Sequence, residues 1–145
     1  MTSLEDVYKA FLSKMNEDEW AEDWSKEEFM EDDRTILDNA IVWFKFPRVN
    51  LNIEDGHFIG TLSNDEIRII ATFMKCEWLD RTILTWENVK PMYDERDFSP
   101  ANRLREYRLL LEKEQKEARR LEALYYRSIK GQPFDYTTLA GGGKS

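Results

Sequence analysis

The stretch from Ser99 to Gly131 places the strongest constraint on how this chain folds. Its apolar residues recur three or four positions apart, as on one face of a helix: Leu104, Tyr107, Leu111, Ala118, Leu121 and Tyr125. Ser99 is a preferred helix cap, Pro100 is tolerated at the first helical position, and Gly131 can adopt the left-handed conformation that ends a helix. We therefore predict one uninterrupted helix over residues 100–130, roughly 45 Å long at 1.5 Å per residue. Such a helix is longer than a small core needs, so it must span or pack against something else.

Three shorter helices are predicted before it. Ser3 precedes apolar residues at helical spacing up to Met15, which predicts a helix over residues 4–15. Ser25 and Glu28 form a capping box that starts a second helix, and this helix should continue until Pro47 stops it. The acidic segment between these two helices is expected to be a link.

A second capping box, Ser63 with Glu66, starts the third helix. We expect this helix to continue to about Asp80, with a turn or kink before Thr82, because the threonines that follow have weak helix propensity.

The period changes from helical to alternating between Pro47 and Ser63. Asp55-Gly56 lies between two alternating runs, which predicts a β-hairpin over residues 48–62. The alternative is an ordered loop with an extended backbone. Because an isolated hairpin is marginally stable in water, it must lie on helices or pair with a hairpin of another subunit.

Residues 131–145 have no helical period. Phe134, Tyr136 and Leu139 are spaced apolar residues without room for a core of their own, which predicts an extended tail that docks on another surface. The alternative is a disordered terminus. The predicted fold is thus mainly α: one bundle of about four helices over residues 1–130, a hairpin insertion and an extended docking tail.

Charge is unevenly distributed along the chain, whose formal net charge is −8. Residues 1–33 contain twelve acidic and three basic residues, whereas the stretch 99–131 contains nine basic and five acidic residues. These two parts can attract each other, within one subunit or between neighbours. The negative total disfavours nonspecific binding to nucleic acid, because that affinity comes from Lys and Arg displacing phosphate counterions.

The sequence also limits the chemistry that we expect. Cys76 is the sole cysteine, which fits a reducing compartment and excludes an intrachain disulfide. No secretory signal and no run of about eighteen apolar residues is present, so neither export by that route nor membrane insertion is predicted. His57 lacks a nucleophile at motif spacing, and Gly143-Lys144-Ser145 lacks the earlier glycine and the following helix of a phosphate-binding loop. The acidic clusters at residues 17–19 and 31–33 lack the spacing of a calcium loop. We expect no enzyme activity, cofactor or metal site.

Residues 74–130 resemble a family of small head–tail connector, adaptor or neck proteins of tailed bacteriophages. The resemblance is carried by Trp78-Leu79, by the segment from Asp97 to Asn102, by Ala118-Arg119-Arg120-Leu121 and by Leu124-Tyr125-Tyr126-Arg127. It implies a helical protomer in a homo-oligomeric ring, usually dodecameric. That ring would lie in the virion between the portal protein and the next neck or tail-completion protein, after synthesis in the host cytoplasm. DNA would pass through it without specific binding.

The same resemblance implies two sets of contact residues. Leu104, Tyr107, Leu111, Leu121 and Tyr125 would pack subunits together, and the tail residues Phe134, Tyr136 and Leu139 would dock on the portal or a neighbour. An alternative from a different class is a small acidic cytosolic regulator, which would use the stretch from Glu17 to Asp33 to bind a protein partner or to occupy a basic DNA-binding site in place of DNA.

Overall fold

A computed structural model describes residues 1–18, 21–22, 24–89 and 99–127. The described chain is mainly helical, as predicted. The predicted tail with Phe134, Tyr136 and Leu139 lies outside the described residues, as does the expected helix end at Gly131. None of the described helices combines the length and the apolar character that crossing a membrane would require.

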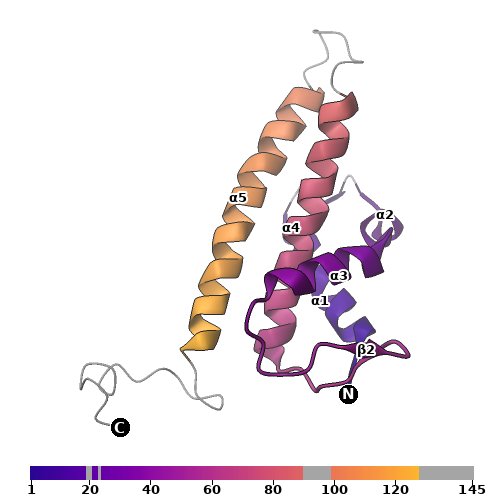
Figure 1. Cartoon of the computed structure of the whole chain (residues 1–145). Coiled ribbons are helices and arrows are strands. Elements are labelled where there is room, and N and C mark those ends of the chain that lie inside the picture. The colour runs from indigo at the N-terminus through magenta and orange to yellow at the C-terminus, as the bar shows by residue number, and fades with distance from the viewer. Residues whose placement is uncertain (19–20, 23, 90–98, 128–145) are drawn as a thin grey trace, which may run out of the picture.

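Two long antiparallel helices form the largest unit of the molecule. Helix α4 (Asn64–Val89) has 26 residues and helix α5 (Ser99–Tyr126) has 28. Figure 1 shows the two side by side, with the ends near Val89 and Ser99 projecting beyond the other helices. The predicted long helix is therefore confirmed as far as Tyr126. The helix end expected near Asp80 is wrong, because α4 continues without a turn to Val89.

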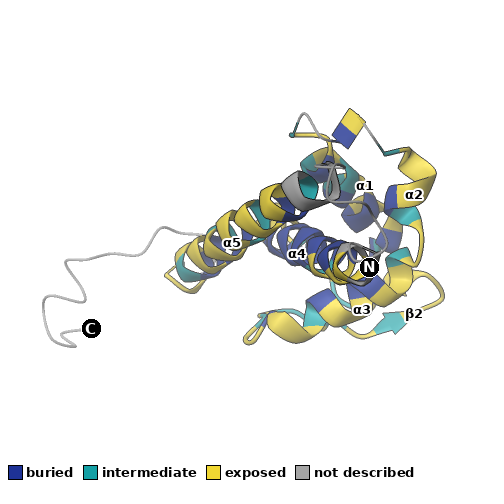
Figure 2. Cartoon of the chain, turned by 90° about the horizontal axis from the view of Figure 1, so that it is seen from above, coloured by how far each residue is buried: buried dark blue, intermediate teal, exposed yellow. Residues whose placement is uncertain are grey.

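Helix α4 is the centre of the core. Helices α1 (Leu4–Met15), α3 (Asp33–Trp43) and α5 all pack against it, and Figure 2 shows them arranged around it. All eight residues from Ile69 to Cys76 are buried. A helix enclosed in this way is buried on every side, so its sequence shows no polar face in this region.

The helix predicted to begin after Ser25 and continue to Pro47 is divided in two, so that prediction is wrong. The capping box of Ser25 and Glu28 is present, but the short helix α2 (Lys26–Met30) ends there, and Asp32 has a left-handed backbone with φ 57° before α3 begins. The ring of Phe29 on α2 packs edge-on against Trp78, with centroids 5.2 Å apart. Tertiary packing of this ring outweighs the helix propensity of the sequence.

The predicted hairpin is present and has one more strand than expected. Strands β2 (Ile53–Glu54) and β3 (His57–Phe58) flank a turn at Asp55-Gly56, where both residues have positive φ (50° and 77°), as a type I′ turn requires. Strand β1 (Thr2–Ser3) pairs with the other edge of β3, giving the order β1-β3-β2. Phe58 is fully buried in the core. The hairpin is thus stabilised by its own chain, through β1 and through the helices beneath it.

Candidate functional site

The residues predicted to pack subunits together have contacts within one chain. Leu104, Tyr107, Leu121 and Tyr125 are buried in the core, and Leu111 is half-buried against it. The hydroxyl of Tyr107 accepts a hydrogen bond from the indole of Trp24 at 3.0 Å. These side chains hold α5 against α4, so a contact between subunits through α5 has to use its other faces.

The outward face of α5 is basic. Six basic residues of α5 are exposed, and so is Arg127 directly after the helix. The exposed acidic residues over the same range are Glu106 and Glu112. The exposed basic residues are Arg105, Arg108, Lys113, Lys116, Arg119, Arg120 and Arg127. Two exposed leucines, Leu109 and Leu124, lie on the same outward face. We call this surface the basic face of α5.

A pocket of about 490 Å³ opens on this basic face, where α5 lies beside the end of α1 and the start of α4. We call it the α1–α5 pocket. Its lining includes Leu109 and many charged residues: Lys14, Glu17, Arg68, Glu112, Lys113, Glu114, Lys116, Glu117 and Arg120. Three elements that are distant in sequence therefore contribute charges to one cavity.

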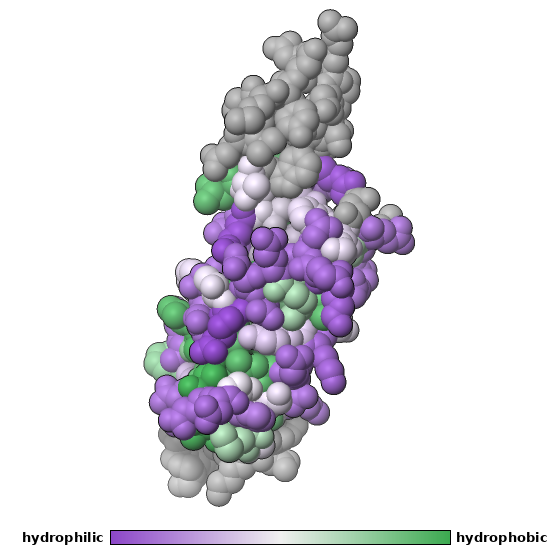
Figure 3. All heavy atoms as spheres, turned by 90° about the vertical axis from the view of Figure 1, so that its right-hand side faces the viewer, coloured by the Kyte–Doolittle hydropathy of each residue, from purple (hydrophilic) through white to green (hydrophobic). Residues whose placement is uncertain are grey.

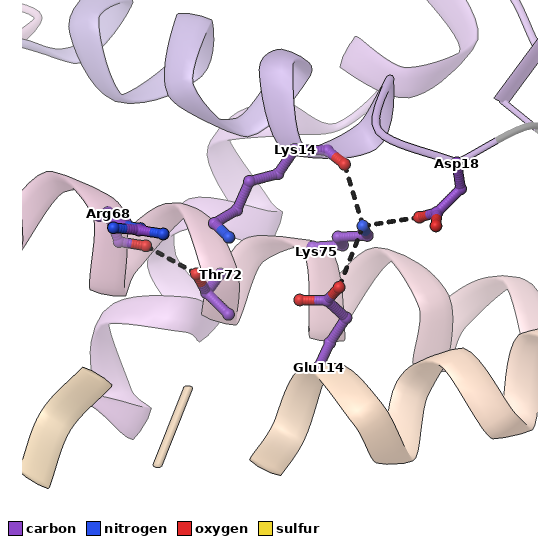
Figure 4. Close-up of polar contacts among 6 residues, drawn as sticks. All are labelled: Lys14, Asp18, Arg68, Thr72, Lys75 and Glu114. Atoms are coloured by element: carbon purple, nitrogen blue, oxygen red, sulfur yellow. Dashed lines mark hydrogen bonds and ion pairs between the residues drawn. The ribbon is translucent and has the colours of Figure 1, made fainter. Parts of the chain in front are cut away.

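A buried lysine joins these elements beneath the pocket. The ammonium of Lys75, on α4, is fully buried and donates to the Lys14 carbonyl (2.9 Å) and to Asp18 (2.9 Å), and it pairs with Oε1 of Glu114 on α5 (3.2 Å). Figure 4 shows this arrangement, with the second oxygen of Glu114 pointing away from Lys75, to the side where Lys14 and Arg68 lie. That oxygen, Oε2, is buried and has no hydrogen-bond partner among the described residues.

The charges that line the pocket do not cancel. Glu112 pairs with Lys116 (3.3 Å) and Glu117 with Arg120 (2.6 Å). The hydrogen bond from Arg120 lowers the pKa of Glu117, so this carboxylate stays ionised. Among the described residues, Lys14, Arg68 and Lys113 have no ion pair, and of the lining acids only Glu17 lacks one as well. The lining contains five basic and four acidic residues, so the pocket has a small positive excess, and Lys14 and Arg68 also help to lower the pKa of Glu117.

An acidic surface lies on the other side of the protomer. Glu27, Glu28, Glu31 and Asp32 are all exposed on α2 and at the α2–α3 junction. Lys26 is also exposed there. We call this surface the acidic corner. Figures 1 and 2 both show α2 and α5 on opposite sides of α4. Residues 27–32 of the acidic stretch thus lie away from the basic face, whereas Glu17 lines the α1–α5 pocket and Asp18 pairs with Lys75.

A second groove, of about 430 Å³, lies between α3, α4 and α5 beside Trp43. The Trp43 indole donates to Glu77 (2.8 Å), and the Arg119 guanidinium lies over the rings of Trp43 and Phe73. Val42 and Phe46 nearby in sequence are strongly exposed. Figure 3 shows that hydrophobic residues gather in the lower part of the face that carries α2 and α3, below a mostly hydrophilic upper part.

The surroundings of His57 and Cys76 indicate a structural role for each of these two residues. His57 is exposed in the hairpin, and its Nδ1 lies 3.0 Å from the Asp55 carbonyl oxygen. Burial raises the pKa of the Cys76 thiol to about 12, which keeps it protonated and unreactive. Within the described part of the chain, no three His, Cys, Asp or Glu residues are grouped closely enough to hold a metal ion.

Sequence reasoning did not identify Lys75 or Glu114. Each belongs to a charged residue type that is almost never fully buried unless it is paired. The available signal was the position of Lys75 near the end of the largely apolar run from Ile69 to Cys76. The link to phage connector proteins rests on the sequence motifs described above, since comparisons with protein-family models, curated proteins and solved structures found no match for this chain.

Proposed function

We propose that this protein is a structural protein of a tailed-phage virion, a head–tail connector or adaptor that forms a homo-oligomeric ring. The observation that supports this most directly is the placement of the acidic corner and the basic face of α5 on opposite sides of one protomer. Two different, complementary surfaces of this kind suit a head-to-tail contact between copies. Such contacts generate a closed ring when the rotation between neighbours closes.

The α4–α5 pair suits such a ring because it gives each protomer a tall lateral wall. At 1.5 Å per residue the two helices extend for about 40 Å. Their buried residues stabilise the protomer itself, which leaves the outward face of α5, with its basic residues, Leu109 and Leu124, for a neighbouring copy.

The proposed partners above and below the ring are the portal protein and the next neck or tail-completion protein. Docking on the portal is assigned to Phe134, Tyr136 and Leu139 of the tail, which fit edge addition or side-chain pockets. The net charge of −8 suits a conduit through which DNA slides without adhering.

The test is the mass of the purified full-length chain by native mass spectrometry, alone and with a portal protein encoded in the same genome. We expect a ring that binds the portal, and a chain truncated after Lys130 that still forms the ring but loses the portal. A strictly monomeric chain, whose truncated form loses no partner, would contradict the connector function. A monomer that binds a basic protein through Glu27 and Glu31 would instead indicate the acidic regulator.

A further inference from the structure

We infer that the α1–α5 pocket is the socket for the acidic corner of a second copy of this chain, and that the pocket is incomplete without that copy. The inference rests on the proposed ring and specifies the contact that would build it. Glu27 and Glu31 of the second copy would meet the unpaired cations of the pocket, and Lys26 of that copy would donate to Glu114.

The first argument comes from Glu114. Its side chain is only 6% exposed, Oε1 pairs with Lys75, and Oε2 has no partner among the described residues. A buried carboxylate oxygen without a donor is unfavourable, because it has lost its contact with water without replacement. Glu114 also lines the pocket, so a group that enters the pocket comes close to this carboxylate, and it can donate to Oε2 once the Glu114 side chain turns this buried oxygen towards the opening.

The second argument comes from the cations around Glu114. Lys14, Arg68 and Lys113 line the same pocket without an ion pair in the described part of the chain, whereas most of the acids there are neutralised by neighbours. A ligand that fits must therefore bring carboxylates for these cations and one hydrogen-bond donor for Glu114.

The acidic corner has this combination of groups. Glu27 lies on α2 and Glu31 is the residue that caps the end of this helix, and both side chains are exposed. Lys26 is exposed beside them and supplies the donor. Because the corner and the pocket lie on opposite sides of α4, one copy cannot fill its own pocket, and each contact requires a neighbour.

Charge exchange tests this contact with two variants of the full-length chain. The socket variant carries Arg68→Glu and Lys113→Glu, and the corner variant carries Glu27→Lys and Glu31→Lys. All four side chains are exposed, so both variants are expected to fold. Each variant alone should assemble at least about 100-fold more weakly than the original chain, because like charges then face each other across the contact.

A 1:1 mixture of the two variants should restore the ring. In the mixture, the acidic socket of one variant meets the basic corner of the other, and the remaining socket and corner keep their original charges. The matched control is Lys9→Glu, which places an acid at an exposed position of α1 outside both the pocket and the basic face of α5 and should leave assembly unchanged. Lys26→Met should weaken assembly by about tenfold or more, through loss of the charged donor to Glu114.

The readout is native mass spectrometry over a concentration series, with a labelled DNA duplex as a separate binding probe. If the original chain forms a ring and both variants form it equally well, the socket is wrong while the proposed function stands. If the original chain is monomeric at all concentrations, the proposed function fails and the socket fails with it. Unchanged assembly with DNA binding that is lost in the socket variant would overturn the inference and assign the pocket to nucleic acid.

Discussion

Lys75 carries a buried charge that depends on several polar partners. Its ammonium is fully buried and is held by the Lys14 carbonyl and Asp18 at the end of α1 and by Glu114 on α5. Replacing Lys75 with Met keeps the apolar stem but leaves two carboxylates without their cation. We expect a loss of about 3–5 kcal/mol in the free energy of unfolding, measured by urea denaturation.

The control for this variant is Lys9→Met, at an exposed position of α1, which should change stability by no more than about 0.5 kcal/mol. Adding Asp18→Asn and Glu114→Gln to Lys75→Met removes the uncompensated charges and should recover much of the loss. A Lys75→Met protein as stable as the original would show that the cluster contributes nothing to stability.

Tyr125 provides a prediction about pH. Its hydroxyl donates to Glu66 (2.7 Å) and accepts from the Arg48 amide (2.8 Å), and burial followed by the Glu66 hydrogen bond raises its pKa from 10.0 to about 12. The folded state therefore holds the phenolic proton more tightly than the unfolded state. The stabilisation that comes from this raised pKa of Tyr125 is fully present below pH 10. It is lost as the pH rises from 10 towards 12.

Tyr125→Phe isolates this contribution. At neutral pH the variant should lose about 1–3 kcal/mol, because Glu66 and the Arg48 amide lose a partner. Urea unfolding above about pH 10 should then show a shallower decline with pH for Tyr125→Phe than for the original chain. Parallel declines would mean that the phenol titrates alike in the folded and unfolded states. Tyr8, whose pKa burial also raises to about 12, is present in both proteins and cancels in the comparison.

At the scale of single elements, the hairpin contains two glycines that are needed for different reasons. Gly56 has φ 77° with no atom within 4 Å of an added Cβ, whereas an added Cβ at Gly60 would lie 2.8 Å from the Asn50 carbonyl oxygen and would also collide with Val49. Gly56→Ala should cost about 1–2 kcal/mol through backbone strain alone. Gly60→Ala should cost about 1–3 kcal/mol through steric conflict and should disturb the backbone locally.

Chemical shifts of the amides of Asn50 and Asn52 distinguish these two mechanisms. They should move in Gly60→Ala, because an added Cβ at residue 60 would lie 3.0 Å from the Asn50 amide nitrogen, and the Asn52 amide donates to the Asn50 side chain at 2.8 Å. They should stay nearly unchanged in Gly56→Ala. The reverse pattern would contradict the close approach at Gly60.

The same elements show what a sequence can predict. The Asp55-Gly56 turn and the capping boxes at Ser25 and Ser63 were predictable because their chemistry is local: φ > 0 suits Gly, and the serine and glutamate side chains satisfy amides three residues away. The break at Asp32 was not predictable, because Phe29 and Ile36 keep helical spacing across it. The contacts that hold α2 are tertiary: Phe29 packs on Trp24 and Trp78, and Asp32 pairs with Arg81. Strand β1 was missed because two residues provide no detectable period.

For the whole molecule, the composition of each segment was visible in the sequence, but the positions of the charges in space were not. An acidic N-terminal part and a basic long helix were evident, and they were compatible with pairing inside one chain or between chains. Once the helices are packed, α2 and α5 lie on opposite sides of α4, which favours pairing between chains. The socket depends on Lys75 and Glu114, whose burial arises only when α1, α4 and α5 come together.

A contact built from these surfaces should respond to salt. The proposed interface joins exposed carboxylates to exposed Lys and Arg, whose attraction is screened over about 10 Å at 0.1 M salt and about 3 Å at 1 M. Raising the salt from about 0.1 M to about 1 M should therefore shift the protein from ring to monomer, as followed by light scattering after size-exclusion chromatography. Assembly that strengthens with salt would indicate an apolar interface, such as the groove beside Trp43, in place of the charged one.

The most direct test of the central claim is the native mass of the full-length chain at low salt, compared with that of a 1:1 mixture of the socket and corner variants. We predict one closed ring mass for the original chain, monomers for each variant alone, and a ring of alternating variants for the mixture. An original chain that remains at 17.3 kDa at every concentration would contradict the proposal that this protein assembles through its two opposed charged surfaces.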